Sequence, residues 1–174
     1  VVDQGDYHLY CFVMNSKDLR GIAYVSRRES TGNKGYQRHF SPKRLREVGT
    51  YISKSKSTFP NSIVVYLQSD MVRLYPNLTD PKCGHIEIRK QENTAWIIDG
   101  QHRLYGFEYS NGKEFDLIIA SYIGLSLPEQ ASIFRVINSE QKGVSASLIF
   151  DLIDLTKDAE YYDTRAHEIV KALN

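Results

Sequence analysis

The feature that most constrains the fold is an apolar run that passes without a linker into a short polar motif. Residues 96–98 have the composition of the end of a buried strand. Asp99-Gly100-Gln101-His102-Arg103 follows, and the next residues have the pattern of an amphipathic helix. A strand that enters a helix through this motif brings a carboxylate, an imidazole and a guanidinium to one corner. Because the free N–H groups of a helix start favour an anion, we predict a functional site here rather than a simple turn.

The remaining patterns predict a mixture of strands and helices. Apolar, β-branched and aromatic residues predict strands at 8–14, 21–26, 63–67, 85–89, 94–98 and 115–123. Helical periodicity is present at 42–52, after residue 126, and near 146–156 and 158–173. Since strands come mainly early and helices mainly late, we expect an α+β fold with a mixed β-sheet flanked by helices. We assign residues 1–125 to this core and 126–174 to a helical extension that packs on the same domain.

Two helix starts have capping signals. Ser41 precedes Pro42, which suits the first helical position, and apolar residues at 45, 48 and 52 form one face of the helix that follows. Ser126 and Glu129 fit a capping box, which opens a helix with apolar residues at 131, 134 and 137. Both helices are therefore predicted to begin at these residues.

The charges are divided unevenly along the chain. Residues 1–107 hold 16 Lys and Arg against 10 Asp and Glu, whereas residues 108–174 hold 6 against 11. Part of the basic excess lies on the predicted helix after Pro42, at Lys43, Arg44 and Arg46. This asymmetry is typical of a protein that meets a polyanion, and a solvated helix face explains it equally well.

The sequence does not indicate a membrane or secreted protein. No apolar run approaches the ~18–20 residues of a membrane span, and no basic-then-apolar signal peptide opens the sequence. Cys11 and Cys83 lie far apart without metal-site spacing, which favours two free thiols in a reducing compartment. We therefore expect a cytoplasmic location. The sequence begins at Val1 and stops at Asn174 within a helical pattern, so we also expect a part of a longer protein.

Three segments, in this order, resemble the DGQHR-domain proteins. That family includes DndB-like proteins of DNA phosphorothioation clusters and relatives in 7-deazaguanine DNA-modification clusters. The motif at 99–103 matches the signature for which the family is named. Residues 36–65 resemble the first box of the wider ParB/sulfiredoxin superfamily, and residues 134–145 resemble its later Asn-x-x-Gln box. The resemblance implies a ParB/sulfiredoxin-like fold.

The resemblance also implies a pocket for ATP or another nucleoside triphosphate with Mg²⁺. Gly100 would let the backbone approach the phosphates, and Arg103 would give the phosphate oxygens a fixed positive charge. Gln101 would also belong to the nucleotide-binding residues. His102 would donate to a phosphate or move a proton, and Asp99 would act as general base or position a water. Asp99 and His102 are therefore the catalytic candidates.

Two further segments would complete this pocket. The resemblance places Gln37 and Arg38 on one side of the phosphates and Gln141 and Lys142 on another, with Asn138 helping to hold the metal. Taken alone, the first segment is typical of a solvated loop. The second, taken alone, is equally typical of a helix C-terminus with a lysine on its dipole.

Two departures from known motifs reduce the number of reactions that this chain could catalyse. Sulfiredoxins have a nucleophilic cysteine where this chain has Gln101, so their sulfinic-acid chemistry is excluded. No Gly-x-x-x-x-Gly-Lys-Ser/Thr occurs, which excludes a Walker-type ATPase at the motif level. A nuclease ranks last because a metal nuclease needs a denser carboxylate cluster than Asp99 alone offers.

The leading expectation is an ATP-binding, ATP-hydrolysing DGQHR-domain protein that acts on or near DNA in a DNA-modification or defence system. Lys43, Arg44 and Arg46 are the residues expected to contact phosphates of the DNA backbone. The alternative is a non-enzymatic DNA-binding regulator of such a gene cluster. DNA, a nucleotide and other proteins of the cluster are the expected partners, and oligomer formation is left open.

Overall fold

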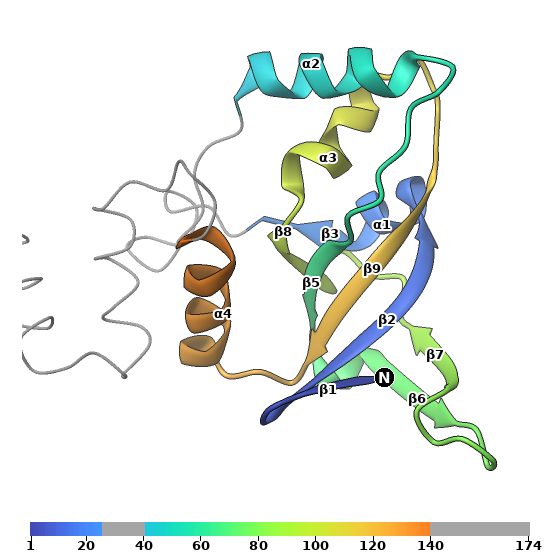
Figure 1. Cartoon of the computed structure of the whole chain (residues 1–174), viewed down its shortest axis with the longest axis vertical. Helices are drawn as coiled ribbons and strands as arrows, with labels where there is room; N and C mark the ends of the chain where they lie inside the picture. Colours follow the sequence, from blue (N-terminus) through green and yellow to red (C-terminus); the bar gives the residue numbers. More distant parts are fainter. Residues whose placement is uncertain (26–40, 140–174) are drawn as a thin grey trace, which may run out of the picture. The chain divides into compact units, whose positions relative to one another are not determined.

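A six-stranded mixed sheet and a separate two-stranded hairpin carry the fold (Figure 1). The structure is a computed structural model that describes residues 1–25 and 41–139. The chain divides into two compact units, Val1–Ser26 with Arg38–Gly124 and Arg27–Gln37 with Leu125–Asn174. All the described strands belong to the first unit, and the described part of the second is essentially one helix.

The sheet combines parallel and antiparallel neighbours. Its strands and those of the hairpin are β1 (Val2–Gln4), β2 (Tyr7–Asn15), β3 (Ala23–Tyr24), β5 (Ile63–Leu67), β6 (Val72–Pro76), β7 (Gly84–Ile88), β8 (Ala95–Asp99) and β9 (Asp116–Ile123). The order in the sheet is β1-β2-β9-β5-β8-β3, and β6 pairs with β7 in the hairpin. β5 is parallel to β9 and β3 to β8, whereas the other neighbours are antiparallel. This arrangement confirms the predicted mixed sheet with helices, while the ParB/sulfiredoxin-like fold stays a prediction.

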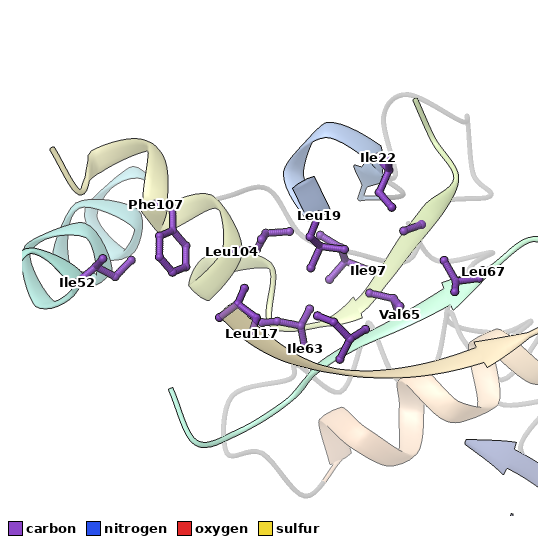
Figure 2. Close-up of a cluster of buried hydrophobic side chains, with 12 residues drawn as sticks. Leu19, Ile22, Ile52, Ile63, Val65, Leu67, Ile97, Leu104, Phe107 and Leu117 are labelled. Atoms are coloured by element: carbon purple, nitrogen blue, oxygen red, sulfur yellow. The ribbon is translucent and has the colours of Figure 1, made fainter. Parts of the chain in front are cut away.

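One face of the sheet carries the core. Successive residues of a strand point to opposite faces, and alternate apolar residues of the three central strands are buried together: Ile63, Val65, Leu67, Ala95, Ile97, Leu117 and Ile119. Side chains from helices α1 (Ser16–Ile22), α2 (Pro42–Ser53) and α3 (Gln101–Tyr105), and from the 3₁₀ turn η2 (Gly106–Tyr109), pack against them. Figure 2 shows the resulting cluster, which extends from Ile52 and Phe107 to Leu67.

Most predicted strands are confirmed to within one residue, but three segments differ from the prediction. The short strand β1 was not predicted, because its three residues are all exposed and show no apolar face. Within residues 21–25, the described part of the strand predicted at 21–26, Gly21 and Ile22 end α1 and two residues form β3. The helix forms because Asn15 caps it, accepting a hydrogen bond from the Lys17 N–H (3.0 Å), and because Leu19 and Ile22 are buried. β6 was not predicted, since most of its side chains are exposed and show no apolar face.

The two predicted helix starts are confirmed. At α2, the Ser41 hydroxyl accepts a hydrogen bond from the Arg44 N–H (3.3 Å). At α4 (Leu127–Ser139), one Glu129 carboxylate oxygen accepts from the Ser126 N–H (2.7 Å) and hydroxyl (2.6 Å), and these bonds lower the pKa of Glu129.

The remaining helical predictions are not tested by the structure. The helices predicted near 146–156 and 158–173 lie outside the described residues, and the packing of 126–174 on the core stays a prediction. Within residues 1–25 and 41–139, no helix has the length and apolar character needed to cross a membrane.

Candidate functional site

The strand-to-helix passage predicted at residues 96–107 is confirmed, and Gly100 forms the turn between the two elements. β8 ends at Asp99, α3 begins at Gln101, and Gly100 between them has a left-handed backbone with φ +96°. A Cβ atom at this position would lie 2.6 Å from Cδ1 of Ile63 and 3.1 Å from a guanidinium nitrogen of Arg103. Both the backbone conformation and the lack of space therefore require glycine here.

The side chain of Arg103 links this turn to Asn61, which lies just before β5. One of its terminal nitrogens donates to Oδ2 of Asp99 (2.9 Å), and the other donates to the backbone carbonyl of Asn61 (2.7 Å). The side chains of the ion pair are 21% and 25% exposed. Asp99 and Arg103 thus neutralise each other at the end of β8. A guanidinium has five N–H groups, so these two bonds orient the arginine without using its full donor capacity.

His102 connects the motif with the start of α2. Its Nε2 lies 3.5 Å from the backbone nitrogen of Ser41, which donates to it. Burial and the positive charge of Arg44 lower the pKa of the imidazole, and the Asp99 carboxylate opposes this only in part. His102 is therefore neutral near pH 7, with Nε2 as acceptor and the proton on Nδ1.

The basic helix α2 lies beside this corner (Figure 1). A Cβ atom at Gly49 would lie 2.5 Å from the Cβ of Tyr109, so glycine lets α2 approach η2 closely. The three predicted DNA-contacting residues, Lys43, Arg44 and Arg46, are all exposed. Arg44 is also near enough to His102 to influence its pKa. The structure thus brings the basic helix and the motif into one surface region of the first unit.

The other predicted pocket segments are not placed by the structure. Gln37, Arg38, Gln141 and Lys142 lie outside the described residues. Asn138 belongs to α4, in the second unit, and its side chain is not described. Of the predicted nucleotide site, the structure therefore assembles the motif at 99–103, in which Gln101 is the half-buried first residue of α3.

The described residues of this corner fit a phosphate better than a tightly held metal. Because Asp99 and Arg103 neutralise each other, Arg44 gives this corner a net positive charge. Within the described parts of the chain, no group of three or more His, Cys, Asp or Glu side chains is placed to hold a metal ion. Mg²⁺ in nucleotide sites is commonly held by one or two carboxylates together with phosphate oxygens, so a nucleotide would bring most of its ligands.

Sequence reasoning missed two contacts of this corner. The carbonyl of Asn61 fixes Arg103, and the N–H of Ser41 contacts His102. Both are backbone groups, which every residue except proline offers in full, so no residue-type signal marks them. Ser41 was identified as a helix cap, and that position indicated only where α2 begins.

Comparison with known proteins identifies one family. The model of the DndB family, described as DNA-sulfur modification-associated, matches residues 1–171. No curated protein and no solved structure matches the chain.

Proposed function

Because the chain belongs to the DndB family of DNA-sulfur modification-associated proteins, we propose that it contacts DNA through α2 and binds a nucleoside triphosphate at the corner formed by residues 99–103. The family membership associates the chain with a DNA sulfur modification system. It favours the phosphorothioation type over the 7-deazaguanine type that the sequence left open. DNA contact, nucleotide binding and hydrolysis are the steps that the proposal adds.

The observation that carries the proposal is the contact between the motif and the basic helix. His102 accepts from the Ser41 N–H at the start of α2, and Arg44 on the first turn lowers the pKa of His102. A phosphate bound at the corner would therefore lie beside the residues proposed to contact the DNA backbone. Phosphate oxygens suit both places, because arginine and helix N–H groups bind them without regard to sequence.

Each residue of the corner has a role in this proposal. Arg103 holds a phosphate oxygen, and neutral His102 donates from Nδ1 or moves a proton. Asp99 positions the attacking water or accepts its proton. Since Arg103 is paired with Asp99, the bound nucleotide must first draw the guanidinium away from the carboxylate. When bound, Mg²⁺ would supply neutralisation of the phosphate charge.

A second candidate function is a DNA-binding regulator without hydrolysis. One observation favours it: Asp99 and Arg103 are paired, and Arg103 also holds the Asn61 carbonyl. Arg103 occupies Oδ2 of Asp99, so a water molecule cannot take that place unless the arginine leaves it. In this reading the pair braces the turn, and the corner is a ligand sensor or part of the scaffold.

Phosphate release separates the two candidates. ATP and Mg²⁺ are added with and without duplex DNA to the wild type, Asp99→Asn, Arg103→Lys and the control Glu108→Gln, which removes an exposed carboxylate on η2. We expect the two motif variants to lose about 10²-fold or more of the rate and the control to keep it. Equal background rates in all four proteins, with DNA binding intact, would support the regulator and contradict hydrolysis.

Charge reversal tests the role of α2. A variant with Lys43, Arg44 and Arg46 all changed to glutamate should lose affinity for duplex DNA, and the slope of log K against log salt should fall by about 3, close to 0.9 per phosphate contact. The control changes Lys17, Lys56 and Lys113, which lie outside both α2 and the β6–β7 hairpin, to glutamate, with the same change of net charge. If both triple variants lose affinity equally, the contact is a general charge effect and α2 is not the site.

A further inference from the structure

A groove is lined by residues of β1, β2 and the β6–β7 hairpin. Figure 1 shows these strands at the end of the sheet opposite α2 and α3. The volume of the groove is about 540 Å³, which is within the range of sites for small organic ligands. All its lining residues belong to the first unit. None of them belongs to the motif at 99–103 or to α2, so the groove is a separate feature.

Aromatic rings from both sides line the groove. β2 contributes Tyr10 and Phe12, and the hairpin contributes Tyr75 and His85, whose ring centroids are 6.2 Å apart. The Tyr75 hydroxyl donates to a carboxylate oxygen of Glu87 (2.9 Å), which fixes the direction of the ring. Tyr75 nevertheless remains 48% exposed. An oriented and accessible ring on a paired strand is suited to stack on a flat ligand.

The rim of the groove suits an anionic ligand. Asp3 accepts from Nζ of Lys82 and from Nδ1 of His8, both at 2.8 Å. Lys82, and after it His8, lower the pKa of Asp3, so its charge is present and balanced by the lysine. A lysine ammonium has three N–H donors, so Lys82 can contact a phosphate oxygen while it stays paired with Asp3. The rim therefore offers a phosphate donor in the same groove as the ring of Tyr75.

The cysteines of the groove do not indicate thiol chemistry. Cys11 and Cys83 both line it and are free and exposed. A hydrogen bond and the negative charge from Asp80 raise the pKa of the Cys83 thiol, which keeps it protonated and weakly nucleophilic. As the described residues also include no metal-binding group of three or more side chains, aromatic stacking is the interaction that the lining favours.

We propose that this groove takes an unpaired nucleobase of a DNA strand, stacked on Tyr75, with the adjoining phosphate near Lys82. Every base has a flat face, so such a site accepts a strand without reading its sequence. The inference rests on the proposed contact with DNA and adds a single-stranded segment as its target. It places that segment at the end of the sheet opposite α2.

Binding of labelled oligonucleotides tests the groove. Wild-type protein is titrated into a twenty-nucleotide thymidine strand and into an abasic strand of the same length, which keeps the phosphates and lacks the bases. We expect the wild type to bind the thymidine strand about 10-fold more tightly than the abasic one. Tyr75→Ala and Tyr10→Ala should remove that difference. Tyr75→Phe, which keeps the ring, and Tyr109→Ala, a 44% exposed tyrosine on η2 outside the groove, should retain it.

Three outcomes would overturn the proposal. The wild type could bind the two strands with equal affinity, Tyr75→Ala could keep the preference for the thymidine strand, or Tyr109→Ala could lose that preference as fully as Tyr75→Ala. A free mononucleotide that displaces the labelled strand as well as an unlabelled strand does, at the same total concentration of nucleotides, would overturn the assignment to a DNA strand. The triple variant of α2 keeps this test separate from the proposed function. If that variant binds duplex DNA normally while the base preference depends on Tyr75, DNA contact through α2 is contradicted and base binding in the groove is supported.

Discussion

The two ends of the six-stranded sheet are built in opposite ways. Where β8 meets α3, polar side chains are half-buried and held by distant partners: Arg103 by Asn61, 42 residues away, and His102 by Ser41, 61 residues away. At the other end, beside the hairpin, Leu74 and Tyr75 remain 41% and 48% exposed. Their strand is paired through the local β6–β7 register.

The two ends of the sheet should therefore differ in how well they tolerate amino-acid substitutions. Residues of the corner position one another before any ligand binds, so altering one of them disturbs the folding of several segments. Residues of the groove depend on a local hairpin and present accessible surfaces. We therefore expect substitutions at the corner to lower the free energy of unfolding, and substitutions in the groove to change binding at nearly constant stability.

The largest effect is expected from Gly100→Ala. Its left-handed backbone and the 2.6 Å approach to Ile63 together should lower the free energy of unfolding by about 3 kcal/mol, measured in urea. Gly112→Ala is the matched control, since Gly112 has φ +80° and open space around it, and it should cost about 1 kcal/mol. Similar losses in the two variants would show that the corner is not tightly packed.

The ion pair of the corner ranks next. A double-mutant cycle with Asp99→Asn and Arg103→Gln should yield a coupling energy of about 1–2 kcal/mol, between the values typical of exposed and of buried pairs. The exposed pair of Lys43 and Glu47, with a separation of 4.0 Å, serves as the reference and should yield about 0.3 kcal/mol. Equal couplings would mean that Arg103 does not brace the turn.

Loss of the α2 cap should have a smaller effect. Ser41→Ala removes the hydroxyl that accepts from Arg44 N–H and should lower the free energy of unfolding by about 1 kcal/mol. Ser55→Ala, at an exposed position after the same helix, should change it by less than about 0.5 kcal/mol. A Ser41→Ala protein as stable as the wild type would separate the stability of the corner from the start of α2.

The pH dependence due to His102 is a weaker test of the corner. Its pKa is below the ordinary 6.5 in the folded chain, so the unfolded chain takes up more protons as the pH falls through that value. The stability due to the neutral imidazole is thus present above pH 6.5 and is lost below it. Unfolding measured between pH 7 and pH 5 should show a steeper loss for the wild type and Ser41→Ala than for His102→Gln. Parallel curves would contradict this role of His102.

The smallest effect is expected in the groove. Tyr75→Phe loses the hydrogen bond to Glu87 on an exposed strand, so the free energy of unfolding should change by less than about 0.5 kcal/mol. A loss comparable to that of Gly100→Ala would remove the contrast between the two ends of the sheet.

Local signals in the sequence predicted much of the fold. The strand at 63–67, the strand-to-helix passage at Gly100, and the helix starts at Ser41 and Ser126 all depend on residues within a few positions of one another. Where tertiary burial decided, prediction failed. Gly21 and Ile22 have strand-like neighbours but belong to α1, because Leu19 and Ile22 are buried on one side of that helix.

By itself, the sequence determined that an acid, a base and a cation meet at a strand-to-helix turn and that a basic helix begins at Ser41. Tertiary structure decided what those groups do: Arg103 is paired with Asp99 and with a backbone carbonyl, and His102 is neutral beside Arg44. It also joined Tyr10 and Tyr75 in one groove. Periodicity and capping act within one or two helical turns, whereas the choice of partner and the pKa of a side chain are set by segments that meet only after the chain has folded.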